Sequence, residues 1–190
     1  LYFADLTQDK VTVTLIGPGN PADMYGTKLA YKDTNGVKTY DLSTKDLVEI
    51  PVTKCSGTEI IIDADRLFTR YVENWEGSYH MYDLVSGTQT ELLSSGGTLP
   101  RFDVSGNKLV YDALYGSTLD NYGLIVLDVT SNKKREIFFK DYTVDDIPID
   151  YLSGPVMVDN NLATFVCDNN VWLCDLEAET ITQVTTDGAY

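Results

Sequence analysis

The stretch VWLCDLEAETITQVTTDG, from Val171 to Gly188, determines how the rest of the sequence is interpreted. An apolar run leads into Asp175, a short polar segment follows, and Thr and Val then alternate with polar residues. This order is typical of a strand, a tight turn and a second strand. Four other twelve-residue segments align with the stretch that begins at Asp175 without insertion; they begin at Asp5, Asp41, Asp83 and Asp128.

The aligned columns favour a β-hairpin in every copy. Leu or Val follows each Asp, and an apolar residue always lies four positions before it. A carboxylate at the end of a strand can accept hydrogen bonds from backbone N–H groups and fix the following turn. We therefore expect the recurrent Asp to be structural, because a catalytic group belongs to an asymmetric constellation and would not recur in every copy.

A second motif alternates with the hairpins, which makes the repeating unit four strands long. A turn residue and a strand-like run occur around Leu29, Leu67, Leu109 and Leu162, and another possible strand precedes each of them. The Asp residues at 5, 41, 83, 128 and 175 are separated by 36, 42, 45 and 47 residues. A four-stranded unit of this length predicts an all-β fold, a β-propeller of four-stranded blades, with an irregular all-β domain as the alternative.

The repeats predict a single β-propeller domain or propeller fragment over residues 1–190. Its parts are a half-blade with the third and fourth strands at 1–16 and complete blades at about 18–52, 57–94, 98–139 and 146–186. The sequence starts with Leu1 inside a predicted strand, so we expect the native N-terminus to be missing. Either the chain is a small five-bladed ring with one half-blade, or a second chain or further residues complete a larger ring.

Composition limits the classes of partner. The net charge is −15 and the pI is about 4.2, which disfavours nucleic acid and suits basic partners or cations. No apolar run approaches the roughly 20 residues that span a bilayer, so no membrane insertion is expected. The cysteines are Cys55, Cys167 and Cys174, and His80 is the single histidine. This set makes a zinc site improbable, and buried free thiols are expected.

The repeats resemble the TolB-like or WD-repeat-like propeller family. The segments that carry the resemblance are DVSGNKLVYDA, GVKTYDLSTKDLVEIPV, GSYHMYDLVSGTQTELL and VWLCDLEAETITQVTTDGA. Val104-Ser105-Gly106 stands where the family shows Pro-Asp-Gly, so the repeats have diverged. The resemblance implies a structural repeat that serves periplasmic TolB, the propeller domains of peptidases and many cell-surface proteins. No Gly-x-Ser-x-Gly elbow occurs, and no catalytic residue is carried over.

The long loops supply the candidate binding residues. In a propeller the loops after the second and fourth strands of each blade share one face, where ligands usually bind. The aromatic and acidic candidates on this face are Trp75, Tyr79, Tyr115, Tyr122, Tyr142, Asp145 and Asp146. They suit a protein partner or a sugar, and the alternative is that the aromatic side chains pack the loops in place.

Metal and acid–base chemistry have weaker support. Acidic residues cluster between Asp141 and Asp150, but their spacing differs from that of an EF-hand loop. Calcium therefore remains possible, no metal site is assigned, and no cofactor is expected. His80 lies on a predicted third strand, where we expect a packed or surface residue and not a catalytic base.

Three functions remain open after these observations. The first is a non-catalytic binding or scaffold propeller that mediates protein–protein interaction outside the cytoplasm, in the periplasm, in secreted form or at the cell surface. The second is an accessory propeller of a larger peptidase-like enzyme. The third is a glycan-binding or glycan-cleaving propeller. The sequence shows no catalytic constellation, so we expect a protein that is not an enzyme.

Overall fold

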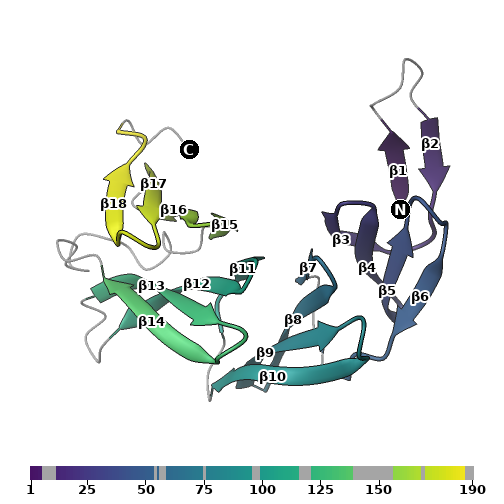
Figure 1. Ribbon diagram of the computed structural model, residues 1–190, viewed down its shortest axis with the longest axis horizontal. Coiled ribbons are helices and arrows are strands. Elements are labelled where there is room, and N and C mark those ends of the chain that lie inside the picture. The colour runs from purple at the N-terminus through teal and green to yellow at the C-terminus, as the bar shows by residue number, and fades with distance from the viewer. Residues whose placement is uncertain are drawn as a thin grey trace. The chain divides into compact units, whose positions relative to one another are not determined.

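The computed structural model describes residues 1–5, 12–53, 55, 59–74, 76–95, 99–115, 121–138, 156–167 and 170–186 (Figure 1). Every regular element in these ranges is a β-strand, and they contain no helix long and apolar enough to cross a membrane. The chain divides into two compact units, Leu1–Leu99 and Pro100–Tyr190.

The first unit contains a two-stranded hairpin and two four-stranded sheets. The strands of each sheet pair antiparallel in chain order. The strands are β1 (Tyr2–Asp5) and β2 (Thr12–Leu15); β3 (Asn20–Tyr25), β4 (Lys28–Asp33), β5 (Gly36–Asp41) and β6 (Leu47–Ile50); and β7 (Ile60–Asp63), β8 (Arg66–Glu73), β9 (Glu76–Asp83) and β10 (Thr88–Ser95).

The second unit contains two further sheets with the same order. Their strands are β11 (Phe102–Ser105), β12 (Lys108–Tyr115), β13 (Asn121–Asp128) and β14 (Lys133–Phe138); and β15 (Met157–Asp159), β16 (Leu162–Cys167), β17 (Asn170–Asp175) and β18 (Thr180–Gln183). The predicted all-β class built from four-stranded antiparallel sheets is therefore confirmed. The assignment of residues 1–190 to one propeller domain remains a prediction.

The turn between the first two strands has the same backbone conformation in all four sheets. Its first residue is left-handed, with φ between 54° and 58°, at Gly26, Ala64, Gly106 and Asn160. This conformation suits Gly and Asn and is costly for other L-residues. The shared geometry aligns the sheets residue by residue, because each second strand begins two residues after this position.

The structure corrects the predicted register of the last sheet by one residue. The sequence pattern placed Leu162 in the same column as Leu67 and Leu109, which are fully buried. In the structure Leu162 is 47% exposed, and Ala163 takes the fully buried position. The reason is that Leu162 begins β16 directly after the turn, where Arg66 and Lys108 begin their strands. Successive side chains of a strand point to opposite faces, so one residue of slip exchanges inside and outside.

The turn geometry yields a reciprocal stability prediction. Ala64→Gly is expected to raise the free energy of unfolding by about 0.5–1 kcal/mol, since the left-handed conformation costs Ala about 1–2 kcal/mol and the greater freedom of Gly in the unfolded chain offsets part of the gain. Gly106→Ala is expected to lower it by a similar amount, because an added methyl group there meets nothing within 4 Å and only the backbone term changes. Urea denaturation followed by circular dichroism measures both; equal signs for the two variants would contradict the argument.

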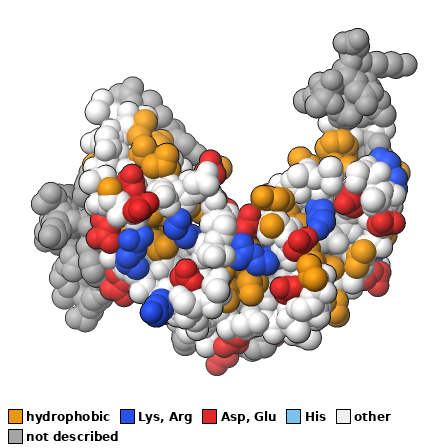
Figure 2. Space-filling view, in the orientation of Figure 1, with side chains coloured by type: hydrophobic (Ala, Val, Ile, Leu, Met, Phe, Trp, Pro, Cys, Tyr) orange, Lys and Arg blue, Asp and Glu red, His pale blue; other side chains and the backbone are white. Residues whose placement is uncertain are grey.

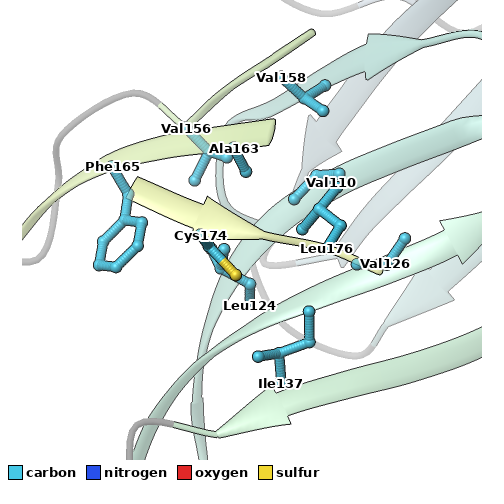
Figure 3. Close-up of a cluster of buried hydrophobic side chains, with 10 residues drawn as sticks. All are labelled: Val110, Leu124, Val126, Ile137, Val156, Val158, Ala163, Phe165, Cys174 and Leu176. Atoms are coloured by element: carbon cyan, nitrogen blue, oxygen red, sulfur yellow. The ribbon is translucent and has the colours of Figure 1, made fainter. Parts of the chain in front are cut away.

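The apolar core of each unit lies between its two sheets. In the second unit the cluster joins residues of β12, β13 and β14 to residues of β15, β16 and β17 (Figure 3). Its members are Val110, Leu124, Val126, Ile137, Val156, Val158, Ala163, Phe165, Cys174 and Leu176. The first unit has an equivalent cluster of Ala30, Val37, Ile50, Ile60, Ile62, Leu67 and Tyr82. Removing this apolar surface from water is the main force that holds the sheets of each unit together.

A half-buried carboxylate forms the same inter-sheet bond in both units. Asp23 on β3 accepts a hydrogen bond from the backbone N–H of Ile62 on β7 at 2.9 Å. Asp103 on β11 accepts one from the backbone N–H of Val158 on β15 at 2.7 Å. Each carboxylate also accepts from the N–H of the residue that follows it. Asp23 and Asp103 occupy the same position relative to the left-handed turn residue, so the bond repeats with the fold.

A lysine supplies a second repeated link. Lys28, the first residue of β4, donates to Asp65 in the turn of the next sheet. Lys108, the first residue of β12, donates to Asn161 and to the carbonyl of Asn160 in the corresponding turn. The two sheets of each unit are therefore joined by the same pair of polar contacts at one end of their apolar interface.

Candidate functional site

The Asp that ends each third strand closes the next turn, as the sequence predicted. Asp41, Asp83, Asp128 and Asp175 each accept hydrogen bonds from the backbone N–H groups two and three residues ahead, at 2.7 to 3.3 Å. These bonds lower the pKa of all four carboxyls, and for Asp41 the Ser43 hydroxyl is the largest cause and brings the pKa to about 2. The repeated carboxylates are therefore used by the fold.

The sole histidine belongs to a buried polar cluster in the β7–β10 sheet. His80 on β9 is 5% exposed and pairs with Thr69 on β8 and with Glu91 on β10. Its Nε2 lies 2.7 Å from the hydroxyl oxygen of Ser78 and 4.0 Å from a carboxylate oxygen of Glu91. Ser78 and His80 are two residues apart on one strand, so their side chains share a face of the sheet.

This arrangement differs from a catalytic relay. In a Ser-His-acid triad the serine contacts one imidazole nitrogen and the acid orients the ring through the other. Here Ser78 and Glu91 both lie on the Nε2 side of His80. The contacts on the Nε2 side hold the imidazole in the sheet, with the serine and the acid on the same nitrogen.

A polar pocket of about 300 Å³ opens beside this cluster, at the end of the sheet where β8 passes to β9 and where β10 ends. Its hydroxyl and carboxylate groups come from all three strands. The lining residues are Tyr71 on β8; Glu76, Gly77 and Ser78 on β9; and Glu91, Ser94 and Ser95 on β10. The end of β8, the start of β9 and the end of β10 lie at this end of the sheet.

A β-bulge in β10 brings two of the lining residues to one face. The pairing shifts between Glu91, which lies opposite His80, and Leu93, which lies opposite Tyr79. Ser94 then lies opposite Ser78. In a regular strand Glu91 and Ser94 would point to opposite faces, since they are three residues apart. The extra residue Leu92 lets both side chains face the pocket, a common use of bulges near functional sites.

Negative charge and oxygen acceptors dominate the lining. Glu76 and Glu91 contribute carboxylates, and none of the seven lining residues that the structure describes is a Lys or Arg. The hydroxyl of Tyr71 donates to the carboxylate of Glu73. The pocket therefore suits a ligand that donates hydrogen bonds.

The candidate binding residues that the sequence predicted lie in different settings in the structure. Tyr79 is fully buried within β9, so its side chain has no surface for a partner in this unit. Tyr115 ends β12 opposite Asn121, and Tyr122 lies in β13 opposite Leu114. Their side chains lie outside the description. Trp75, Tyr142, Asp145 and Asp146 lie outside the described residues.

The sequence patterns did not predict the polar lining residues Tyr71, Glu76, Ser78, Glu91, Ser94 and Ser95. The one available signal was the adjacent pair Leu92-Leu93 in TQTELLSS, which interrupts the alternation of apolar and polar residues. Such an interruption marks a bulge, but it does not show which side chains meet across the sheet.

Metal-ligating side chains and cysteine thiols are the remaining residue types that could form a site. Within the described ranges, no group of three or more His, Cys, Asp or Glu side chains could hold a metal ion. The calcium hypothesis concerns residues 141–150, which lie outside them. Cys55 and Cys174 are free thiols, and burial raises the pKa of Cys174 to about 11. A thiol with so high a pKa is unreactive at neutral pH.

Apolar side chains also reach the surface of both units. The most exposed are Tyr2, Val13 and Leu15 on the β1–β2 hairpin, and Val85, Met157 and Val184 elsewhere. On the face drawn in Figure 2, apolar side chains are interspersed with acidic and basic ones.

Comparison with solved structures identifies the class of fold. A chain of the nidogen/laminin complex superimposes with a TM-score of 0.62 at 11% identity and covers 97% of this chain and 70% of its own. TolB from Acinetobacter baumannii gives 0.59 at 12% identity, with 98% and 51% covered. Dipeptidyl peptidase 4 from Porphyromonas gingivalis gives 0.61 at 12% identity, with 92% and 34% covered. These likenesses show that the fold is that of a β-propeller.

The chain spans about half of the TolB chain and about a third of the dipeptidyl peptidase chain. No protein-family model matches the chain, and no curated protein sequence matches it.

Proposed function

We propose that this chain is a non-catalytic binding propeller of the TolB-like or WD-repeat-like kind, which contacts a protein partner through the loop end of its β7–β10 sheet. The observation that carries this proposal is the open polar pocket beside an imidazole that has both Ser78 and Glu91 on one nitrogen. Such a site offers hydrogen-bonding groups to a partner, and its serine and acid do not flank the imidazole as they do in a catalytic triad.

The positions of the described acidic side chains favour a binding site over a catalytic site. The recurrent Asp carboxylates close turns, Asp23 and Asp103 join sheets, and none of them faces the pocket. Glu76 and Glu91 remain as acidic groups at the pocket, on a chain with a net charge of −15. An acidic surface speeds association with basic partners and disfavours nucleic acid.

An extracytoplasmic location is part of the proposal. Its support is the resemblance of the hairpins to TolB-like repeats, which occur in periplasmic and cell-surface proteins, together with the propeller fold shared with TolB and with a chain of the nidogen/laminin complex. The proposed function requires neither a cofactor nor insertion into a membrane.

A second candidate function is an accessory propeller of a larger peptidase-like enzyme. The observation in its favour is the fold shared with dipeptidyl peptidase 4 and with the tricorn protease, of whose chains this one spans 34% and 20%. In that case the catalytic groups would lie on other segments of the enzyme, and the β7–β10 pocket would still bind without reacting.

The test is a peptide array and a glycan array probed with the wild-type chain and two variants. Ser94→Arg fills the pocket, and Val85→Arg places the same side chain on an 80% exposed turn residue at the opposite end of the same sheet. We expect peptide signals that Ser94→Arg abolishes and Val85→Arg preserves. Glycan signals without peptide signals, or hydrolysis of ester or peptide substrates that Ser78→Ala abolishes, would overturn the proposal.

A further inference from the structure

We infer that the β7–β10 pocket recognises the cationic end of a lysine or arginine side chain, so that the partner presents a basic residue to it. This inference rests on the proposed function and names the chemistry of the group that the site accepts. It follows from the kinds of atom that line the pocket and from the way that the sheet positions them.

Oxygen-bearing side chains line the pocket from three adjacent strands. Glu76 starts β9, Glu91 lies on the adjacent β10, and Tyr71 lies on β8 on the other side of β9. An alkylammonium group has three donors and a guanidinium has five, and neither has an acceptor. A donor-only cation therefore matches a pocket whose two charged groups, Glu76 and Glu91, both accept hydrogen bonds.

The charge of the lining selects among ligands. Two carboxylates without a basic residue among the described lining repel phosphates, carboxylates and acidic sugars, because like charges in a partly enclosed site are unfavourable. A cation forms charge-assisted hydrogen bonds there, which are about twice as strong as neutral ones. A neutral polyol gains only the weaker bonds, so the pocket favours a cation over a sugar.

The framework around the pocket is set before any ligand arrives. Ser78 is 4% exposed and holds the buried imidazole of His80, which fixes the wall that β9 provides. The bulge at Leu92, which is 5% exposed, anchors β10 and directs Glu91 and Ser94 to the same face. A preorganised site loses less conformational entropy on binding.

The pocket also has room for the end of one side chain. Its volume of about 300 Å³ lies at the lower end of the range for small-molecule sites, which is about 300–1,000 Å³. The end of a lysine or arginine side chain fits this volume, and the open mouth lets the rest of a polypeptide remain outside.

The experiment is an NMR titration of the whole chain with n-butylammonium chloride, followed at the backbone amides of Gly77, Ser78 and Ser94. We expect saturable shifts at these amides with butylammonium and with butylguanidinium. Butanol, sodium butyrate and glucose at the same concentrations are expected to give none. Glu76→Gln combined with Glu91→Gln is expected to weaken binding by about tenfold or more, since hydrogen bonds to charged groups are the strong ones.

The control is Asp46→Asn, which removes a negative charge from an exposed turn of the β3–β6 sheet and is expected to leave the affinity unchanged. Glu76 and Glu91 are both exposed, so the variant chain should fold, and unchanged shifts elsewhere in its spectrum verify this. Equal binding of butanol or glucose, equal loss with Asp46→Asn, or no saturable shift would overturn the inference. A fourth result would overturn the inference and leave the proposed function standing. In it, Ser94→Arg abolishes the peptide signals on the array, but the signals do not depend on Lys or Arg in the peptide.

Discussion

Phe165→Ala is expected to lower the free energy of unfolding of the second unit by about 3–5 kcal/mol, the range for removing a buried phenylalanine. Phe165 is 2% exposed, and it packs from β16 into the cluster that joins the two sheets of this unit (Figure 3). Truncation removes the transfer free energy of the ring and leaves a cavity that a packed β-sheet interface fills only in part. Urea denaturation followed by Trp172 fluorescence measures the change.

A single tryptophan lets the fluorescence report on the second unit alone. The chain has two tryptophans, so a Trp75→Phe background leaves Trp172, which packs against the same cluster, as the only tryptophan reporter. Met157→Ala is the control, because Met157 is 62% exposed on the neighbouring strand and its truncation should change stability by less than about 0.5 kcal/mol. Equal effects of the two substitutions would show that the cluster does not hold the sheets together.

Asp103→Ala is expected to lower the same free energy by about 2 kcal/mol, as hydrogen bonds to charged groups contribute about 1.5–3 kcal/mol. The carboxylate bridges two sheets by accepting from the N–H of Val158 at 2.7 Å and from the N–H of Val104 at 2.9 Å. Its loss leaves two partly buried donors unsatisfied. The same Trp172 assay measures the effect.

Two further substitutions separate the bond from the charge. Asp103→Asn keeps one acceptor oxygen and should cost less than Asp103→Ala. Glu136→Ala removes an exposed carboxylate from β14 of the same unit and should change stability by less than about 0.5 kcal/mol. A cost for Asp103→Ala no larger than that for Glu136→Ala would contradict the proposed inter-sheet link.

The parts of the fold that the sequence predicted are those with local causes. The Asp at the end of each third strand bonds to the N–H groups two and three residues ahead, so its effect lies within one short segment and can be recognised by repetition. The same holds for the alternation of apolar and polar residues, which places four strands in each sheet. The four-stranded antiparallel sheets of the propeller fold followed from these two patterns.

The register of the last sheet could not be derived in this way. NNLATFV and DRLFTRY look alike at their leucines, yet Leu162 is exposed and Leu67 is buried. The deciding feature is the left-handed residue of the turn, Asn160 or Ala64, which is a backbone property. A residue that occupies this conformation without being Gly gives little sign of it in the sequence.

The candidate site depended even more on contacts between strands. Tyr71 and Glu91 lie on different strands and face one pocket because β8, β9 and β10 pair in a particular register with one bulge. The sequence singled out Tyr79, an aromatic residue near a loop, but its position on β9 directs it into the interior. Aromatic character alone could not separate a buried strand residue from an exposed one.

The inter-sheet links show that the repeats have also specialised. Ile61 on β7 and Met157 on β15 occupy the position that Asp23 and Asp103 occupy in their own sheets. Arg66 and Leu162 likewise occupy the position of Lys28 and Lys108. Apolar Ile61 and Met157 thus stand where Asp23 and Asp103 form the inter-sheet hydrogen bond. The aligned hairpins did not predict this difference, because it concerns the first two strands of each four-stranded sheet and the hairpins are formed by the last two.

The central claim is that one blade is repeated, and that a carboxylate at the end of each third strand closes its turn. The most direct test is an NMR pH titration of the side-chain carboxyl carbons. We predict that Asp41, Asp83, Asp128 and Asp175 all titrate below the ordinary aspartate pKa of 3.8, with Asp41 at about 2, while burial raises the pKa of Asp23. The stabilisation from a lowered pKa is present above the ordinary value and is lost as the pH falls through the folded-state pKa, because the unfolded chain then binds more protons. An ordinary pKa at any of the four would contradict the claim for that blade.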